Sequence, residues 1–170
     1  DTEASPAIKK RPLTSGELGI LLAFGISGVA ALIYQVAWNR IFSLVLGSSV
    51  YAFSLILTTF IFGLAMGTLA FSRYCHKLKD LKESFGYLQL GIGFSALAAL
   101  PYFGSIPLVN RWVYLNWGQE FQTIQWANFL TILALIFLPT FFMGAQFPVV
   151  IKLVANRLDS LGQRIGQVYA

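Results

Sequence analysis

The stretch VYAFSLILTTFIFGLAMGTLAF, residues 50–71, has no charged side chain. As an α-helix, which rises about 1.5 Å per residue, it is about 33 Å long. The hydrocarbon core of a bilayer is about 30 Å thick, so the stretch predicts a membrane-spanning helix. Residues 18–38, 85–103 and 124–147 are apolar over comparable lengths. The sequence therefore predicts an all-α membrane protein, built as a bundle of about four transmembrane helices.

The composition of the 170-residue chain supports this class. Charged residues make up 11%, whereas soluble domains carry about 25%. Hydrophobic residues make up 56% and aromatic residues 15%. The chain has a single cysteine, Cys75, so neither an intramolecular disulfide nor a zinc site with several cysteines is expected. No metal site is predicted.

The basic residues are distributed unevenly along the chain. Ten of the twelve lie before the first predicted span, between the second and third, or after the fourth. The positive-inside rule places such segments in the cytoplasm, so both termini and the 73–82 connection are expected there. This topology accounts for the net charge of +5 without a nucleic-acid partner. We expect the protein to be integral to a membrane, a bacterial inner membrane, with the lipid bilayer as a partner.

The outer side of this predicted bundle is rich in aromatic residues, as membrane interfaces are. Residues 104–121 are too broken to span, but Leu108, Trp112 and Leu115 recur at helical spacing. This pattern predicts a short interfacial helix on the outer side. The aromatic belt would consist of Trp38, Tyr51, Trp112, Tyr114, Trp117 and Trp126.

These features divide the chain into three parts. Residues 1–16 are expected to form a cytoplasmic N-terminal segment and residues 17–151 the four-helix transmembrane domain. Residues 152–170 are expected to form a cytoplasmic basic tail. Its last ten residues, LGQRIGQVYA, have the character of a lead-in to a fifth helix that is absent from this chain.

Small and polar residues recur every four positions along the first span, so they share one slowly winding face. Small residues allow two backbones to approach closely, and amide side chains can bond across the contact. We interpret this face as part of a helix-packing seam. The seam is predicted to comprise Ser27, Ala31, Gln35, Asn39, Thr59, Gly63, Gly67, Gly91 and Ser95.

The short connection at residues 47–49 predicts that the first two spans are antiparallel neighbours. Gln35 and Asn39 are therefore expected to pack against the face of Gly63 and Gly67. Arg40 is expected to point toward the outer headgroups or to pair with Glu120. In the fourth span, Pro139 is expected to kink the helix, which should end near Pro148.

A second interpretation gives the first span a ligand-binding role. A candidate polar or ligand cluster there consists of Tyr34, Gln35, Trp38, Asn39 and Arg40. Its aromatic rings and amides could hold a cationic solute. However, the four spans contain no Asp, Glu, Lys or His, so a carrier for ion-coupled transport is missing. A small-molecule ligand is therefore not the leading expectation.

Catalysis has no visible basis in these residues. The only histidine, His76, lies beside Cys75 in the 73–82 connection, where a solvated pair is the ordinary interpretation. No nucleotide-binding loop follows a strand, because no strand is expected. We predict no catalytic residue and no cofactor in this chain.

Four motifs resemble the membrane region of spermidine-synthase-like integral membrane proteins, also described as polyamine aminopropyltransferase-like. That region is in turn similar to the major facilitator superfamily. The resemblance covers residues 18–170 in the same order and spacing. The motifs are SGVAALIYQVAWNRIFSLVLGSSVYAFS (27–54), GLAMGTLAFSR (63–73), LQLGIGFSAL (88–97) and LPTFFMGAQFPVVIK (138–152).

The resemblance implies that a cytoplasmic aminopropyltransferase-like domain follows further membrane helices in such proteins. None of that domain's substrate-binding residues has a counterpart here. The family often has Glu where this chain has Gln35 and Gln89, and Asp where His76 stands. These departures weaken any expectation that a polyamine binds within the membrane.

The leading hypothesis is a non-catalytic membrane domain. It would act as a helix-packing anchor or as an accessory subunit of a larger membrane complex, with protein partners bound through membrane helices. One alternative is a half-transporter or channel for polyamine-like cations. Another is the membrane part of an aminopropyltransferase whose catalytic domain lies outside this chain.

Overall fold

The protein is represented by a computed structural model, which describes residues 15–46, 50–74, 77–78, 80–117 and 120–169. Within these ranges the chain is all-helical and contains no strand, which confirms the all-α part of the predicted class. The helices are α1 (Ser15–Leu46), α2 (Val50–Tyr74), α3 (Leu81–Phe103), α4 (Ile106–Asn116) and α5 (Phe121–Tyr169).

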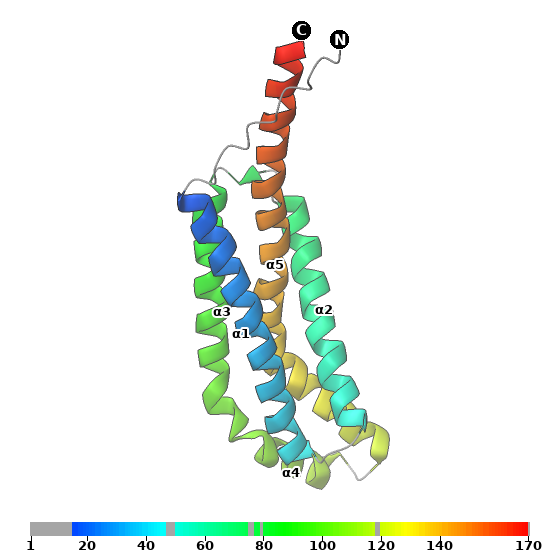
Figure 1. The fold of residues 1–170 in the computed structure, drawn as a ribbon. Coiled ribbons are helices and arrows are strands. Elements are labelled where there is room, and N and C mark those ends of the chain that lie inside the picture. The colour runs from blue at the N-terminus through cyan, green and yellow to red at the C-terminus, as the bar shows by residue number, and fades with distance from the viewer. Residues whose placement is uncertain (1–14, 47–49, 75–76, 79, 118–119, 170) are drawn as a thin grey trace.

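Three helices are long and apolar enough to cross a membrane. Their apolar parts are Leu18–Leu44, Val50–Tyr74 and Phe121–Val154. Helices α3 and α4 meet the same criterion only together, as a pair bent by 57°. The described chain therefore has three candidate spans, or four if the bent pair is one span. Figure 1 shows α4 lying across one end of the bundle, below α1, α2 and α3.

Helices α2 and α5 are parallel neighbours, and their backbones touch. A methyl group added at Gly63 would overlap Thr140, and one added at Gly67 would overlap the carbonyl of Phe141. On α5, a methyl group at Gly144 would overlap the carbonyl of Leu64. Residue numbers increase in the same direction on both helices, and Figure 1 shows both running upward. Only glycine permits this separation, because a Cβ atom would occupy the partner's backbone.

This contact corrects the expected partner of the first span. Gly63 and Gly67 were predicted to receive Gln35 and Asn39 from α1, but α5 occupies that face. The reason lies in α5 itself, where Thr140 and Gly144 have the same four-residue spacing. Two complementary small-residue faces approach more closely than a face bearing Gln and Asn can.

Helix α5 does not end near Pro148, contrary to the prediction. It continues to Tyr169 through both Pro139 and Pro148. Proline has no N–H, so Pro148 cannot bond to the carbonyl of Gly144 one turn earlier. The hydroxyl of Thr68 on α2 lies 3.0 Å from that carbonyl and 2.9 Å from the carbonyl of Leu64. The neighbouring helix thus supplies a donor to the carbonyl that proline leaves without its usual one.

Figure 1 also shows α5 bending between its first part, drawn in yellow, and its orange middle. Pro139 is fully buried and lacks the N–H that would bond to the carbonyl of Leu135. A bend on the N-terminal side of a proline is the usual consequence, because the ring also crowds that carbonyl.

The interior consists of two apolar clusters along the bundle. One cluster lies toward α4 and includes Trp38 and Phe42 of α1 with Ile132 and Ile136 of α5. The other lies toward the start of α3 and includes Phe85, Leu88, Ala145, Val149 and Val150. The apolar part of α1 is the least buried of the three candidate spans.

Candidate functional site: a polar chain across three helices

Gln146 on α5 links three helices through side-chain hydrogen bonds. Its side chain is only 2% exposed. The Nε2 group of Gln89 on α3 donates to Oε1 of Gln146 at 3.1 Å. The Nε2 group of Gln146 in turn donates to Oγ of Ser27 on α1 at 3.2 Å. We call Gln89, Gln146 and Ser27 the polar chain.

The position of Gln146 explains why it needs these partners. Its neighbour Ala145 belongs to the apolar cluster with Phe85 and Val149, and Met143 belongs to the other cluster. A lone amide among such groups would cost several kcal/mol, because neither lipid nor an aliphatic side chain can bond it. In membrane proteins an interhelical bond of this kind contributes about 0.6–2 kcal/mol.

A groove of about 380 Å³ opens between α1 and α3 beside the polar chain. Most of its surface is apolar, and its polar side chains are Ser27, Tyr34 and Gln89. Ala23, Ala30 and Gly93 line it with small side chains, so its walls are close to the two backbones. The groove contains amide and hydroxyl groups but no carboxylate.

The structure places most of the predicted seam residues at contacts inside the bundle. Gly91 packs on the ring of Phe142, where an added methyl group would come within 3.2 Å. Ser95 is buried, and its hydroxyl bonds to the carbonyls of Gly91 and Ile92, at 2.6 and 3.1 Å. Ala31 packs against the cluster that contains Trp38.

Among the residues that the structure describes, three seam and core residues carry buried oxygen atoms that have no hydrogen-bond partner. These atoms are Oδ1 of Asn39, Oγ1 of Thr59 and Oδ1 of Asn128. Thr59 is fully buried, Asn128 is buried, and Asn39 is partly buried. Asn39 therefore faces protein rather than lipid, but we find no hydrogen bond for its carbonyl oxygen.

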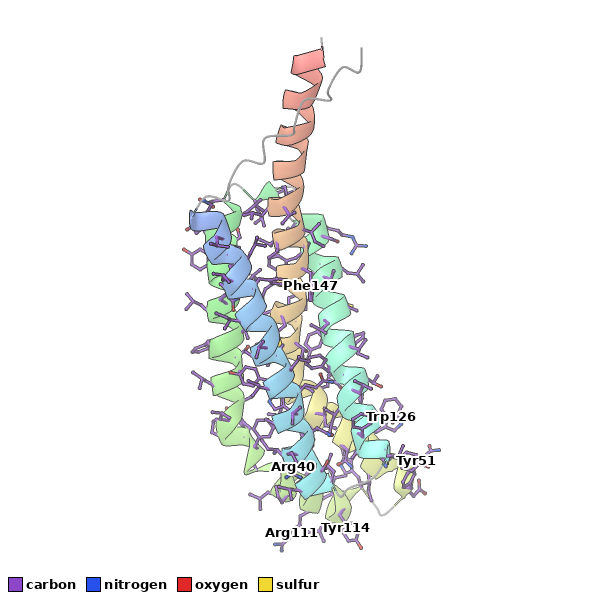
Figure 2. The ribbon with its side chains drawn as sticks, viewed as in Figure 1. Arg40, Tyr51, Arg111, Tyr114, Trp126 and Phe147 are labelled. Atoms are coloured by element: carbon purple, nitrogen blue, oxygen red, sulfur yellow. The ribbon has the colours of Figure 1, made fainter. Side chains whose placement is uncertain are left out.

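The candidate ligand cluster does not converge on one pocket. Tyr34 and Trp38 stack with ring centroids 5.4 Å apart. Trp38 is 3% exposed and also contacts Phe60, so its ring is not open to a solute. Gln35 is partly buried, whereas Arg40 is exposed near the α4 end of α1 (Figure 2). Glu120 is exposed, and the structure shows no ion pair between it and Arg40.

Nothing among the described residues suggests a metal centre. No group of three or more His, Cys, Asp or Glu side chains comes together in that part of the chain. The pair Cys75–His76 lies outside the described residues.

Sequence reasoning missed the residues that connect the helices most directly. Gln146 was noted only within the motif at residues 138–152, and Gln89 only as a departure from the family pattern. Thr68, Thr140 and Gly144 were not singled out. A glutamine inside an apolar run was the available signal, and the same signal had been applied to Gln35.

Comparisons of this chain with protein-family models, with curated proteins and with solved structures give no match.

Proposed function

We propose that this chain is a non-catalytic membrane domain whose role is helix–helix association, as an anchor or as an accessory subunit of a larger membrane complex. The observation that carries the proposal is the polar chain. Gln146, the most deeply buried amide of the described chain, forms its side-chain hydrogen bonds with two other helices. The small-residue contact between α2 and α5 supports it, because both features are means of assembling helices in lipid.

The proposal includes the topology and the kinship expected from the sequence. Both termini would be cytoplasmic, the membrane would be a bacterial inner membrane, and α4 would lie in the outer interface. All four motifs that resemble spermidine-synthase-like membrane regions contain contact residues, namely Ser27, Gly63, Gly67, Gln89 and Gln146. The resemblance would then reflect a common way of packing helices.

Purification of the tagged chain from its native membranes in mild detergent tests this proposal. We expect mass spectrometry to identify a co-purifying membrane protein that a tagged, unrelated four-helix control does not retain. Gln146→Leu should retain less of this partner, and Gln122→Leu is its matched control, because Gln122 is exposed and lies outside the polar chain. A chain that stays monomeric and acts alone would contradict the proposal.

A second candidate function rests on the groove between α1 and α3. Its hydroxyl and amide groups could hold a polyamine-like cation, which is the half-transporter hypothesis. The lack of a carboxylate makes this the weaker candidate, because a desolvated polycation would keep its charge uncompensated. Liposomes containing the chain should take up labelled spermidine, and Gln89→Ala should reduce the uptake. Uptake no higher than in empty liposomes would remove this candidate.

A further inference from the structure

The end of the bundle opposite α4 carries exposed basic side chains close together in sequence. Arg73 lies in the last turn of α2, Lys77 in the connection, and Lys82 in the first turn of α3. All three are exposed. The ammonium of Lys82 extends toward α1, since a methyl group added at Gly16 would lie 3.4 Å from Nζ. We call Arg73, Lys77 and Lys82 the basic rim.

Asp80 and Glu83, the two acidic residues of the segment 73–83, make hydrogen bonds within α3. Oδ1 of Asp80 accepts from the backbone N–H groups of Lys82 and Glu83, at 2.9 and 3.3 Å, and so caps α3. Oε1 of Glu83 accepts from the hydroxyl of Tyr87 at 3.1 Å. Within the described chain no ion pair joins an acid to Arg73, Lys77 or Lys82. Residues 73–83 contain four basic and two acidic residues, so this segment keeps a net positive charge.

The surface next to the basic rim is apolar. Leu69 lies four residues before Arg73 on the same face of α2 and is exposed. On α3, a largely apolar hollow of about 600 Å³ begins at Gln89 and is lined further by Leu90, Phe94 and Leu97 with neighbouring glycines. It begins about 11 Å along the helix from Lys82. Charge and apolar surface are thus arranged in the order of a phospholipid headgroup and its acyl chains.

We propose that the basic rim binds anionic phospholipids of the bilayer, with headgroups at Arg73, Lys77 and Lys82 and an acyl chain along the hollow of α3. Charge complementarity selects this occupant, because the segment that holds the rim has a net positive charge at the depth where apolar surface ends. The opposite end differs: there Arg40 and Arg111 lie among exposed aromatic residues such as Tyr114 (Figure 2). The inference rests on the proposed function in requiring that the chain is embedded in a bilayer.

Lipid retention tests this proposal. The chain is reconstituted in vesicles of mixed phosphatidylcholine and phosphatidylglycerol and extracted in mild detergent, and the retained lipids are quantified by native mass spectrometry. We expect phosphatidylglycerol to be enriched over its share in the vesicles. Each charge removed from the rim should lower the enrichment about fivefold at low salt, and about 0.5 M salt should weaken it as well.

The matched pair is Arg73→Gln and Arg111→Gln, which remove the same exposed guanidinium from opposite ends of the bundle. Only Arg73→Gln should reduce the enrichment, and the triple variant with Lys77→Gln and Lys82→Gln should abolish it. Circular dichroism of each variant checks that the helices are intact.

Three results would overturn this proposal alone. One is retention of the two lipids in bulk proportion by a chain that inserts normally, which leaves the helix-association function standing. Another is an equal loss of enrichment in Arg111→Gln. The third is displacement of the lipid by millimolar inorganic phosphate or by duplex DNA, which would reassign the rim to a soluble anion or to nucleic acid. Failure of the chain to insert into vesicles would overturn both this proposal and the proposed function.

Discussion

At the scale of single residues, the position of an amide around its helix decides whether its side chain bonds to another helix: Gln146 does so, whereas the carbonyl oxygen of Asn39 has no partner. Gln146 was not identified from the sequence as a contact residue, whereas Gln35 and Asn39 were. All three are amides inside apolar runs, so the surrounding sequence does not distinguish them. What separates them is rotation about the helix axis, which places Gln146 between α1 and α3 and leaves Gln35 partly exposed. Helical spacing indicates a face but not the neighbour that covers it.

Replacement of Gln146 by leucine should destabilise the bundle by about 1–2 kcal/mol. The change removes both bonds of the polar chain and leaves Gln89 and Ser27 without their partner. Unfolding in mixed micelles, followed by circular dichroism, measures the loss. Gln122→Leu should change the unfolding free energy little, because Gln122 is exposed. Equal stability of Gln146→Leu and the wild type would show that the polar chain is not a stabilising contact.

Replacement of Gly67 by alanine should destabilise the protein by about 1–3 kcal/mol, because the added methyl group meets the backbone of α5 and must push the helices apart. Gly86→Ala is the matched control. A methyl group at Gly86 meets nothing within 4 Å, so the better helix propensity of alanine should stabilise α3 by up to about 1 kcal/mol. The same unfolding assay applies. Opposite signs for the two variants are expected, and a loss at Gly86 as large as at Gly67 would contradict this interpretation.

At the scale of elements, the sequence located the helices well and their ends poorly. The second and third spans were predicted within a few residues. A long apolar segment in lipid can satisfy all of its own backbone hydrogen bonds only as a helix. The end of α5 was wrong. A proline usually ends a helix when nothing replaces the hydrogen bond that its missing N–H would make. Here the hydroxyl of Thr68, which is distant in sequence, lies within bonding distance of the carbonyl of Gly144. A compensation across helices is invisible until the helices are placed together.

A double-mutant cycle tests this compensation. Thr68→Val removes the hydroxyl donor to Gly144 and should cost about 1 kcal/mol. Pro148→Ala restores a backbone N–H that can bond to the same carbonyl. In the Pro148→Ala background, Thr68→Val should therefore cost clearly less, with a coupling of about 0.5 kcal/mol or more. Additive effects in the two backgrounds would mean that the hydroxyl and the missing N–H are unrelated.

At the scale of the whole molecule, the parallel contact of α2 and α5 constrains the topology. Both helices run the same way, with Gly63 beside Thr140 and Gly67 beside Phe141. If both cross the bilayer, the chain must return between them, and α3 is the helix that provides the return (Figure 1). The bent pair α3–α4 would then be one crossing, and we expect a bundle that crosses the membrane four times.

The most direct test of this claim is the sidedness of the two connections that flank α3–α4. Two variants carry a single cysteine in a Cys75→Ser background, Lys77→Cys before α3 and Asn116→Cys at the end of α4; both positions are exposed. A membrane-impermeant maleimide is applied to intact spheroplasts and to lysed ones. We expect Asn116→Cys to be labelled in intact spheroplasts and Lys77→Cys only after lysis, because the basic connection is proposed to be cytoplasmic. Labelling of both cysteines from the same side would contradict a bundle of four crossings.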